Sequence, residues 1–142
     1  MSGNTKRSVS ITRTAPGKYV ATNARGGKLE FGSGRDSDQF TPVELLLTAI
    51  AGCTAIDVDT VTSRRAEPEQ FELVASGDKI KDEDGGGRME NLEVVFRVRF
   101  PEGPDGDEAR ELLPKMVAKS HDKWCTVSRT VELGTPVRSV VE

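Results

Sequence analysis

Two cysteines, Cys53 and Cys125, are the side chains in this 142-residue sequence with the most distinctive chemistry. Cys53 lies inside the run TPVELLLTAIAGCTAID, which carries no charge between Glu44 and Asp57. A thiol in such a run is either a small core residue or a reactive sulfur held away from water. The residue pattern alone leaves both interpretations open.

A reactive Cys53 would need help to lose its proton, because burial in apolar surroundings favours the neutral thiol. The positive end of a helix dipole acts only within about the first turn of the helix. If a helix begins at Thr41, Cys53 lies about 18 Å along it, at roughly 1.5 Å per residue. A reactive Cys53 therefore requires a cation that comes from another element.

Cys125 lies in HDKWCTVS, at the expected junction of a helix and a strand. Such junctions are often accessible, which suits a resolving thiol, but a core residue at the start of a strand fits equally well. His121, four residues earlier, is either a base for this thiol or a partly exposed histidine at a helix end. Trp124 fits core or interface packing.

The composition restricts the classes of function that remain. The chain has 20 Lys and Arg, 23 Asp and Glu and a net charge of −3, so nothing in it favours nucleic acid or a membrane surface as a partner. One histidine and two distant cysteines do not form the ligand pattern of a zinc site. The sequence contains no glycine-rich nucleotide motif, so we expect no cofactor and no metal.

The expected location is the cytoplasm. The N-terminal residues MSGNTKRSVSITRT contain no apolar segment of the signal-peptide type. The longest uncharged run, from Leu45 to Ile56, is shorter than the ~20 residues that a membrane helix needs. Both thiols would be reduced in that compartment, where a disulfide between them would be reversible.

Turn residues and hydrophobic periodicity predict a single α+β domain over residues 1–142. SVSITRT, KYVATNA and GGKLEFGSG read as a three-stranded meander. TPVE is a capping box with proline at the first helical position, which predicts a helix from Thr41 to about Arg65. Because strands and helices are grouped rather than alternating, the pattern favours α+β over a doubly wound fold.

The second half of the chain predicts a β-hairpin, a broken helix and two final strands. QFELVASGDKIKD and MENLEVVFRVRF alternate in hydrophobicity and flank the turn DGGGR. Asp105 or Asp107 is the expected cap of the next helix, which Pro114 should kink or split. CTVSRTVELG and TPVRSVVE then read as two strands.

The helix that carries Cys53 is apolar on most of its faces, too many for one small sheet to cover. We therefore expect a two-fold homodimer in which this helix packs against its own copy. Four small residues on adjacent faces would permit close contact: Thr48, Ala51, Gly52 and Ala55.

The two cysteine segments, TPVELLLTAIAGCTAIDV and CTVSRTVELGTPV, resemble those of the family of osmotically inducible protein C and organic hydroperoxide resistance proteins (OsmC/Ohr). The resemblance extends over nearly the whole chain. It implies an intertwined homodimer with two active sites at the interface. It also implies thiol-dependent reduction of hydroperoxides in oxidative stress defence.

By position, the resemblance implies that Cys53 is the peroxidatic thiol and Cys125 the resolving thiol. It also implies that Arg25, in ATNARGG, supports the thiolate, which would supply the missing cation. The implied reductant is an external dithiol, such as a lipoyl-bearing protein. Glu44 and His121 are possible supporting residues.

The family pattern has a glutamate directly after the motif proline, where this chain has Val43; its carboxylate is one residue later, at Glu44. One residue turns a helix by about 100 degrees, so the two positions are not equivalent. This departure resembles a divergent OsmC-like branch. Two hypotheses follow: a two-cysteine peroxidase, or a non-catalytic homodimer that binds or senses a small apolar ligand.

Overall fold

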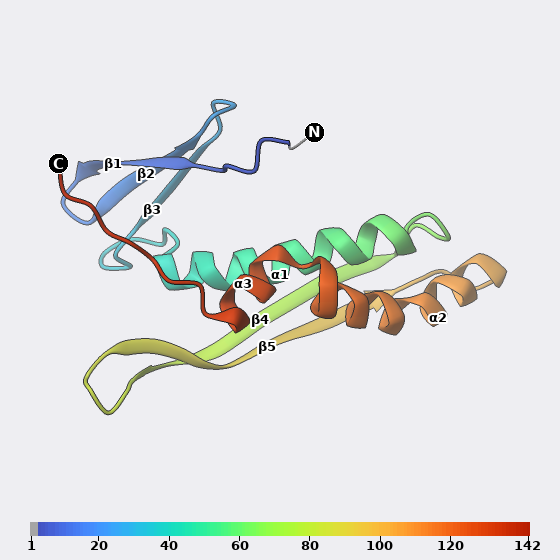
Figure 1. Ribbon diagram of the computed structural model, residues 1–142. Helices are drawn as coiled ribbons and strands as arrows, with labels where there is room; N and C mark the ends of the chain where they lie inside the picture. Colours follow the sequence, from blue (N-terminus) through green and yellow to red (C-terminus); the bar gives the residue numbers. More distant parts are fainter. Residues whose placement is uncertain (1–2) are drawn as a thin grey trace. The chain divides into compact units, whose positions relative to one another are not determined.

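The computed structural model describes residues 3–142 and has an α+β fold (Figure 1). The chain forms two compact units, one up to Leu46 and one from Leu47 onward. The assignment of the chain to a single domain stays a prediction.

The first unit is the predicted three-stranded meander. β1 (Val9–Ala15), β2 (Lys18–Asn23) and β3 (Lys28–Gly32) pair antiparallel in the order β1-β2-β3. Tyr19 on β2 faces Phe31 on β3, and their rings stack with centroids 5.7 Å apart. Phe31 is buried, so this aromatic pair is the apolar centre of the small sheet.

The predicted helix start is confirmed at α1 (Pro42–Thr62). The Thr41 backbone N–H donates to Glu44 Oε1 at 2.8 Å, and the Glu44 N–H donates to Thr41 Oγ1 at 3.3 Å. These two reciprocal bonds are the capping box that the sequence predicts. The helix ends three residues before the expected Arg65, in a turn.

Within one chain, α1 buries a single stripe rather than most of its faces. The buried residues recur every fourth position: Ile50, Thr54, Val58 and Thr62. Elsewhere the helix is open, and Ile56 is 69% exposed. By length and composition alone α1 would also suffice to cross a membrane, a test that core helices of water-soluble proteins pass as well.

The predicted hairpin is confirmed as β4 (Gln70–Lys81) paired antiparallel with β5 (Gly87–Arg99), the long green-to-yellow ribbon in Figure 1. The pairing is interrupted between Ser76 and Asp78. A side chain at Gly77 would meet Leu92 at 2.8 Å, so glycine allows the two strands to pass closely there. The apolar face of β5 continues into Phe100, which is 2% exposed.

The next helix is α2 (Pro104–Lys119), and the predicted cap, Asp105 or Asp107, is wrong. Its N-cap is Gly103, with φ of 120° and no side-chain cap bond, and Pro104 opens the helix. Asp107 instead forms an ion pair with Arg110. Pro114 lies inside α2 without splitting it, and the irregularity comes only after Lys119.

The first of the two predicted final strands is wrong. Ser120–Trp124 form a π-helical turn, η1, and Thr126–Leu133 form the helix α3. Val127 and Val131 are four residues apart, which is helical spacing, and Gly134 ends the helix in the left-handed conformation with φ of 68°. The strand preference of the valines and threonines misled the prediction.

The second predicted final strand is also absent from the described residues. Residues 135–142 form no regular element in the single chain. Val137 and Val141 are 92% and 96% exposed. The apolar residues that suggested a strand therefore contact little within their own chain.

Candidate functional site

The two thiols come from different elements of the second unit. Cys53 lies on α1 and is half-buried, whereas Cys125 is the residue between η1 and α3 and is 0% exposed. Both are free, and the Cys125 side chain lies within hydrogen-bonding reach of the Cys53 thiol. The fold therefore brings together two sulfurs that are far apart in the sequence.

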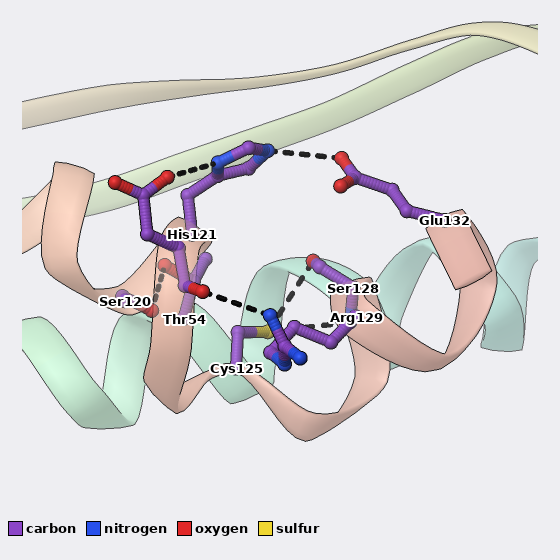
Figure 2. Close-up of polar contacts among 8 residues, drawn as sticks. Thr54, Ser120, His121, Cys125, Ser128, Arg129 and Glu132 are labelled. Atoms are coloured by element: carbon purple, nitrogen blue, oxygen red, sulfur yellow. Dashed lines mark hydrogen bonds and ion pairs between the residues drawn. The ribbon is translucent and has the colours of Figure 1, made fainter.

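Cys125 is held as the N-cap of α3. Its Sγ accepts from the Ser128 backbone N–H at 3.4 Å and donates to Ser128 Oγ at 3.3 Å (Figure 2). An N-cap side chain satisfies one of the amides that have no partner within the helix. A sulfur is thus in the position that serine or aspartate more commonly occupies.

Burial raises the pKa of the Cys53 thiol above its ordinary value. The backbone N–H of Val127 acts in the opposite direction, because it donates to the sulfur and favours the thiolate. The Cys125 thiol and the negative charge of Asp57 raise the pKa further. In a single chain, the neutral thiol is therefore the favoured form of Cys53.

The sequence does not predict the contact between the Val127 amide and the Cys53 sulfur. Val127 lies in the first turn of α3, so its amide belongs to the positive end of that helix. The dipole of α1 is too distant to act on Cys53, but a different helix N-terminus reaches the sulfur. The sequence predicts a strand at this segment, and a strand has no helix N-terminus to offer the sulfur.

Three polar side chains connect α1 to η1 beside the thiols. Thr54 Oγ1 lies 2.8 Å from Ser120 Oγ (Figure 2). Ser120 Oγ also donates to Asp57 Oδ2 at 2.9 Å. Ser120 is 0% and Thr54 is 7% exposed. We call these three residues the α1–η1 polar cluster. Sequence reasoning did not identify them, although Asp57 lies one helical turn beyond Cys53.

His121 lies on η1 with both ring nitrogens bonded to carboxylates. Nδ1 is 3.0 Å from Asp122 Oδ1, and Nε2 is 2.9 Å from Glu132 Oε1 on α3 (Figure 2). These bonds raise the pKa of His121 above its ordinary value, Asp122 contributing most and Glu132 next. The geometry makes His121 a link between η1 and α3, and its use as a base stays a prediction.

Arg25 and Glu44 belong to the first unit. Arg25 lies in the turn between β2 and β3, where its backbone N–H donates to Asn23 Oδ1 at 3.0 Å. Glu44 closes the capping box with Thr41. Neither is placed relative to the two thiols, so their roles at the sulfur stay predictions.

A cavity of about 720 Å³ lies in the second unit beside the polar cluster. Its walls are mainly apolar side chains of α1, the hairpin, α2 and α3. Thr54, the neighbour of Cys53, and Ser128, the partner of Cys125, both line it. The cavity is therefore lined by one residue that adjoins Cys53 and by one that is hydrogen-bonded to Cys125. It has the volume of a small-molecule site.

No group of three or more His, Cys, Asp or Glu among residues 3–142 is arranged to hold a metal ion.

The sequence matches known relatives over most of its length. The model of the OsmC-like protein family matches residues 34–140. An uncharacterized protein of Mycobacterium tuberculosis is 30% identical over 128 residues, which cover 89% of this chain and 90% of that protein.

Solved structures share the fold. An OsmC-like protein of unknown function from Vibrio cholerae has a TM-score of 0.72 at 16% identity, over 90% of this chain and 94% of that one. The organic hydroperoxide resistance protein OhrB of Bacillus subtilis has a TM-score of 0.56 at 18% identity, over 89% and 92% of the two chains. From the family match, the related sequence and the shared fold, we conclude that this chain belongs to the OsmC-like protein family.

Proposed function

We propose that this protein is a thiol-dependent hydroperoxide reductase, with Cys53 as the peroxidatic thiol and Cys125 as the resolving thiol. The observation that carries the proposal is the pairing of two free thiols from separate elements, of which Cys53 is half-buried and Cys125 is buried. Membership of the OsmC-like family and the similarity of fold to OhrB of Bacillus subtilis support the same chemistry.

The proposed reaction proceeds in two steps. The Cys53 thiolate attacks the terminal peroxide oxygen, the O–O bond breaks, and the alcohol leaves with a proton while the sulfur becomes a sulfenic acid. The Cys125 thiol then attacks that sulfur, a disulfide forms and water leaves. An external dithiol returns both cysteines to thiols, and a lipoyl-bearing protein is the proposed source.

The proposal assigns Arg25 to stabilise the thiolate and the departing oxyanion. A cation is needed because burial, Cys125 and Asp57 together favour the neutral Cys53 thiol. Arginine suits the task because it stays charged and offers several donors. Cytoplasmic location and the absence of a bound cofactor are parts of the same proposal.

The proposed active form is a homodimer. The open face of α1 supports it: Thr48 and Ile56 are exposed, and a side chain built at Gly52 would meet nothing within 4 Å. A second copy of α1 would cover these apolar and small residues.

Limited oxidation tests the proposal. Treatment with a substoichiometric lipid-like hydroperoxide should yield one intramolecular disulfide between Cys53 and Cys125, measured by mass spectrometry of peptides. Cys53→Ser should lower hydroperoxide consumption by at least about a thousandfold, because the variant has no thiol nucleophile. If the oxidant is consumed and no disulfide between Cys53 and Cys125 is found, the proposal is wrong.

The second candidate is a non-catalytic homodimer that binds or senses a small apolar ligand. The raised pKa of Cys53, the apolar cavity and Val43 at the position of the motif glutamate favour it. The alkylation rate of Cys53 against pH separates the two functions. A midpoint at or above that of a free thiol, about 8.5, would favour the binding protein.

A further inference from the structure

No residue of the α1–η1 polar cluster, Thr54, Ser120 and Asp57, reacts in the proposed steps, yet the cluster joins the helix that carries Cys53 to the turn that precedes Cys125. Thr54 is adjacent to Cys53, and Asp57 is one turn further along α1. Ser120 opens η1, the turn that leads into Cys125. Thr54 and Ser120 are buried and Asp57 is half-buried, and polar side chains are seldom buried without a structural or functional reason.

The donors and acceptors of the cluster can be assigned. An ionised carboxylate only accepts, so the single Ser120 O–H donates to Asp57 Oδ2. The Thr54 O–H therefore donates to Ser120 Oγ across the 2.8 Å contact. Every hydroxyl proton has a partner, and the arrangement ends on a charged acceptor, which makes the bonds stronger.

Ser120 also holds Cys125 through its main chain. The Cys125 backbone N–H donates to the Ser120 carbonyl at 2.8 Å, which closes the π-helical turn. Ser120 thus bonds to α1 through its side chain and to Cys125 through its backbone carbonyl. A π-helical turn is less favourable than a regular helical one and persists where the surroundings fix it.

We propose that Asp57 is a positioning residue which, through Ser120 and Thr54, fixes the turn that carries Cys125 against the helix that carries Cys53. This inference rests on the proposed function and specifies how the resolving thiol is kept within reach of the peroxidatic one. Holding two reacting groups in place raises their effective concentration. Loss of the Asp57 acceptor would free η1 and lower the tendency of the pair to form a disulfide.

The test is the redox equilibrium of the cysteine pair in glutathione buffers at about pH 7, which requires no peroxide. One oxidised glutathione takes two electrons and two protons from the protein dithiol, giving the disulfide and two reduced glutathiones. Asp57→Ala should lower the equilibrium constant for disulfide formation by about tenfold, which corresponds to about 30 mV. Asp57→Asn keeps an oxygen acceptor for Ser120 and should restore most of the wild-type value.

Thr54→Val is the second variant, because it keeps the side-chain shape and removes one hydrogen bond. It should lower the same constant by about threefold. The matched controls are Asp105→Ala in α2 and Thr14→Val in β1, two exposed positions away from the open face of α1, where Thr14 Oγ1 donates to the Lys18 carbonyl. Both controls should leave the constant unchanged.

The outcomes are distinct. Wild-type values for both Asp57→Ala and Thr54→Val, beside a wild-type pair that oxidises normally, would overturn the positioning role and leave the peroxidase proposal intact. An equal loss in Asp57→Ala and Asp57→Asn would assign the effect to charge and also overturn it. A wild-type pair that forms no intramolecular disulfide would overturn both proposals.

Discussion

Cys53 and Cys125 differ in almost every physical respect except their chemistry. Cys53 is half-buried in the middle of a long helix, and its surroundings favour the neutral thiol. Cys125 is fully buried at a helix N-terminus, where Ser128 bonds to its sulfur twice. This difference fits the proposed roles, in which the half-buried Cys53 sulfur reacts with the oxidant and the fixed Cys125 sulfur then forms the disulfide.

Removal of the proposed cation, Arg25, should have the largest effect on the difference in reactivity between the two cysteines. Arg25→Gln should lower the alkylation rate of Cys53 at neutral pH and reduce peroxide turnover by about a hundredfold, because the thiolate loses its partner. The rate against pH, measured on a Cys125→Ser background, should shift toward higher pH.

Arg13→Gln, in β1 of the same meander, is the matched control and should change neither quantity. Arg25→Lys should retain part of the effect, because the charge remains while the planar fork of donors is lost. An Arg25→Gln variant with the wild-type alkylation profile would remove Arg25 from the site.

The N-cap role of Cys125 at α3 should make the two cysteines differ in how much each contributes to the stability of the fold. Cys125→Ala should lower the free energy of unfolding by about 1–2 kcal/mol, because α3 loses its N-cap and a buried side chain. Cys125→Ser keeps a capping oxygen and should recover most of that loss. Urea unfolding of the reduced proteins measures both.

Cys53→Ala should cost less than Cys125→Ala, because Cys53 is half-exposed and caps no helix. Equal losses from the two alanine variants would contradict this prediction, because neither the cap nor the deeper burial of Cys125 would then add stability.

The smallest expected effect concerns the link between η1 and α3. Because the folded pKa of His121 is raised, its contribution to stability is present below about pH 6.5 and is lost as the pH rises through the folded value. Its side chain is 59% exposed, so solvent screening should keep the contribution below about 1 kcal/mol.

His121→Gln should therefore lower the free energy of unfolding more at about pH 6 than at about pH 8. Glu132→Gln should have a similar but smaller effect, because Asp122 still contacts the ring. A larger loss for His121→Gln at the higher pH would contradict the assigned direction of the pKa shift.

Local signals predicted the parts of the fold that local interactions hold. Thr41 and Glu44 predicted the start of α1 because a capping box is complete within four residues. The hairpin followed from alternation on both sides of one turn. The segment after Cys125 misled because its valines favour a strand, whereas its contacts to Cys125 and the Gly134 terminus decide for a helix.

The sequence by itself determined that a thiol lies deep in an apolar helix, that this helix cannot activate it through its own dipole, and that a second thiol follows a second helix. Only the tertiary structure decided what surrounds the sulfurs: the Val127 amide, the Asp57 charge and the Ser120 bond across elements. The physical reason is that capping and periodicity act within a few residues. The environment of a thiol is set by groups that approach from distant parts of the chain.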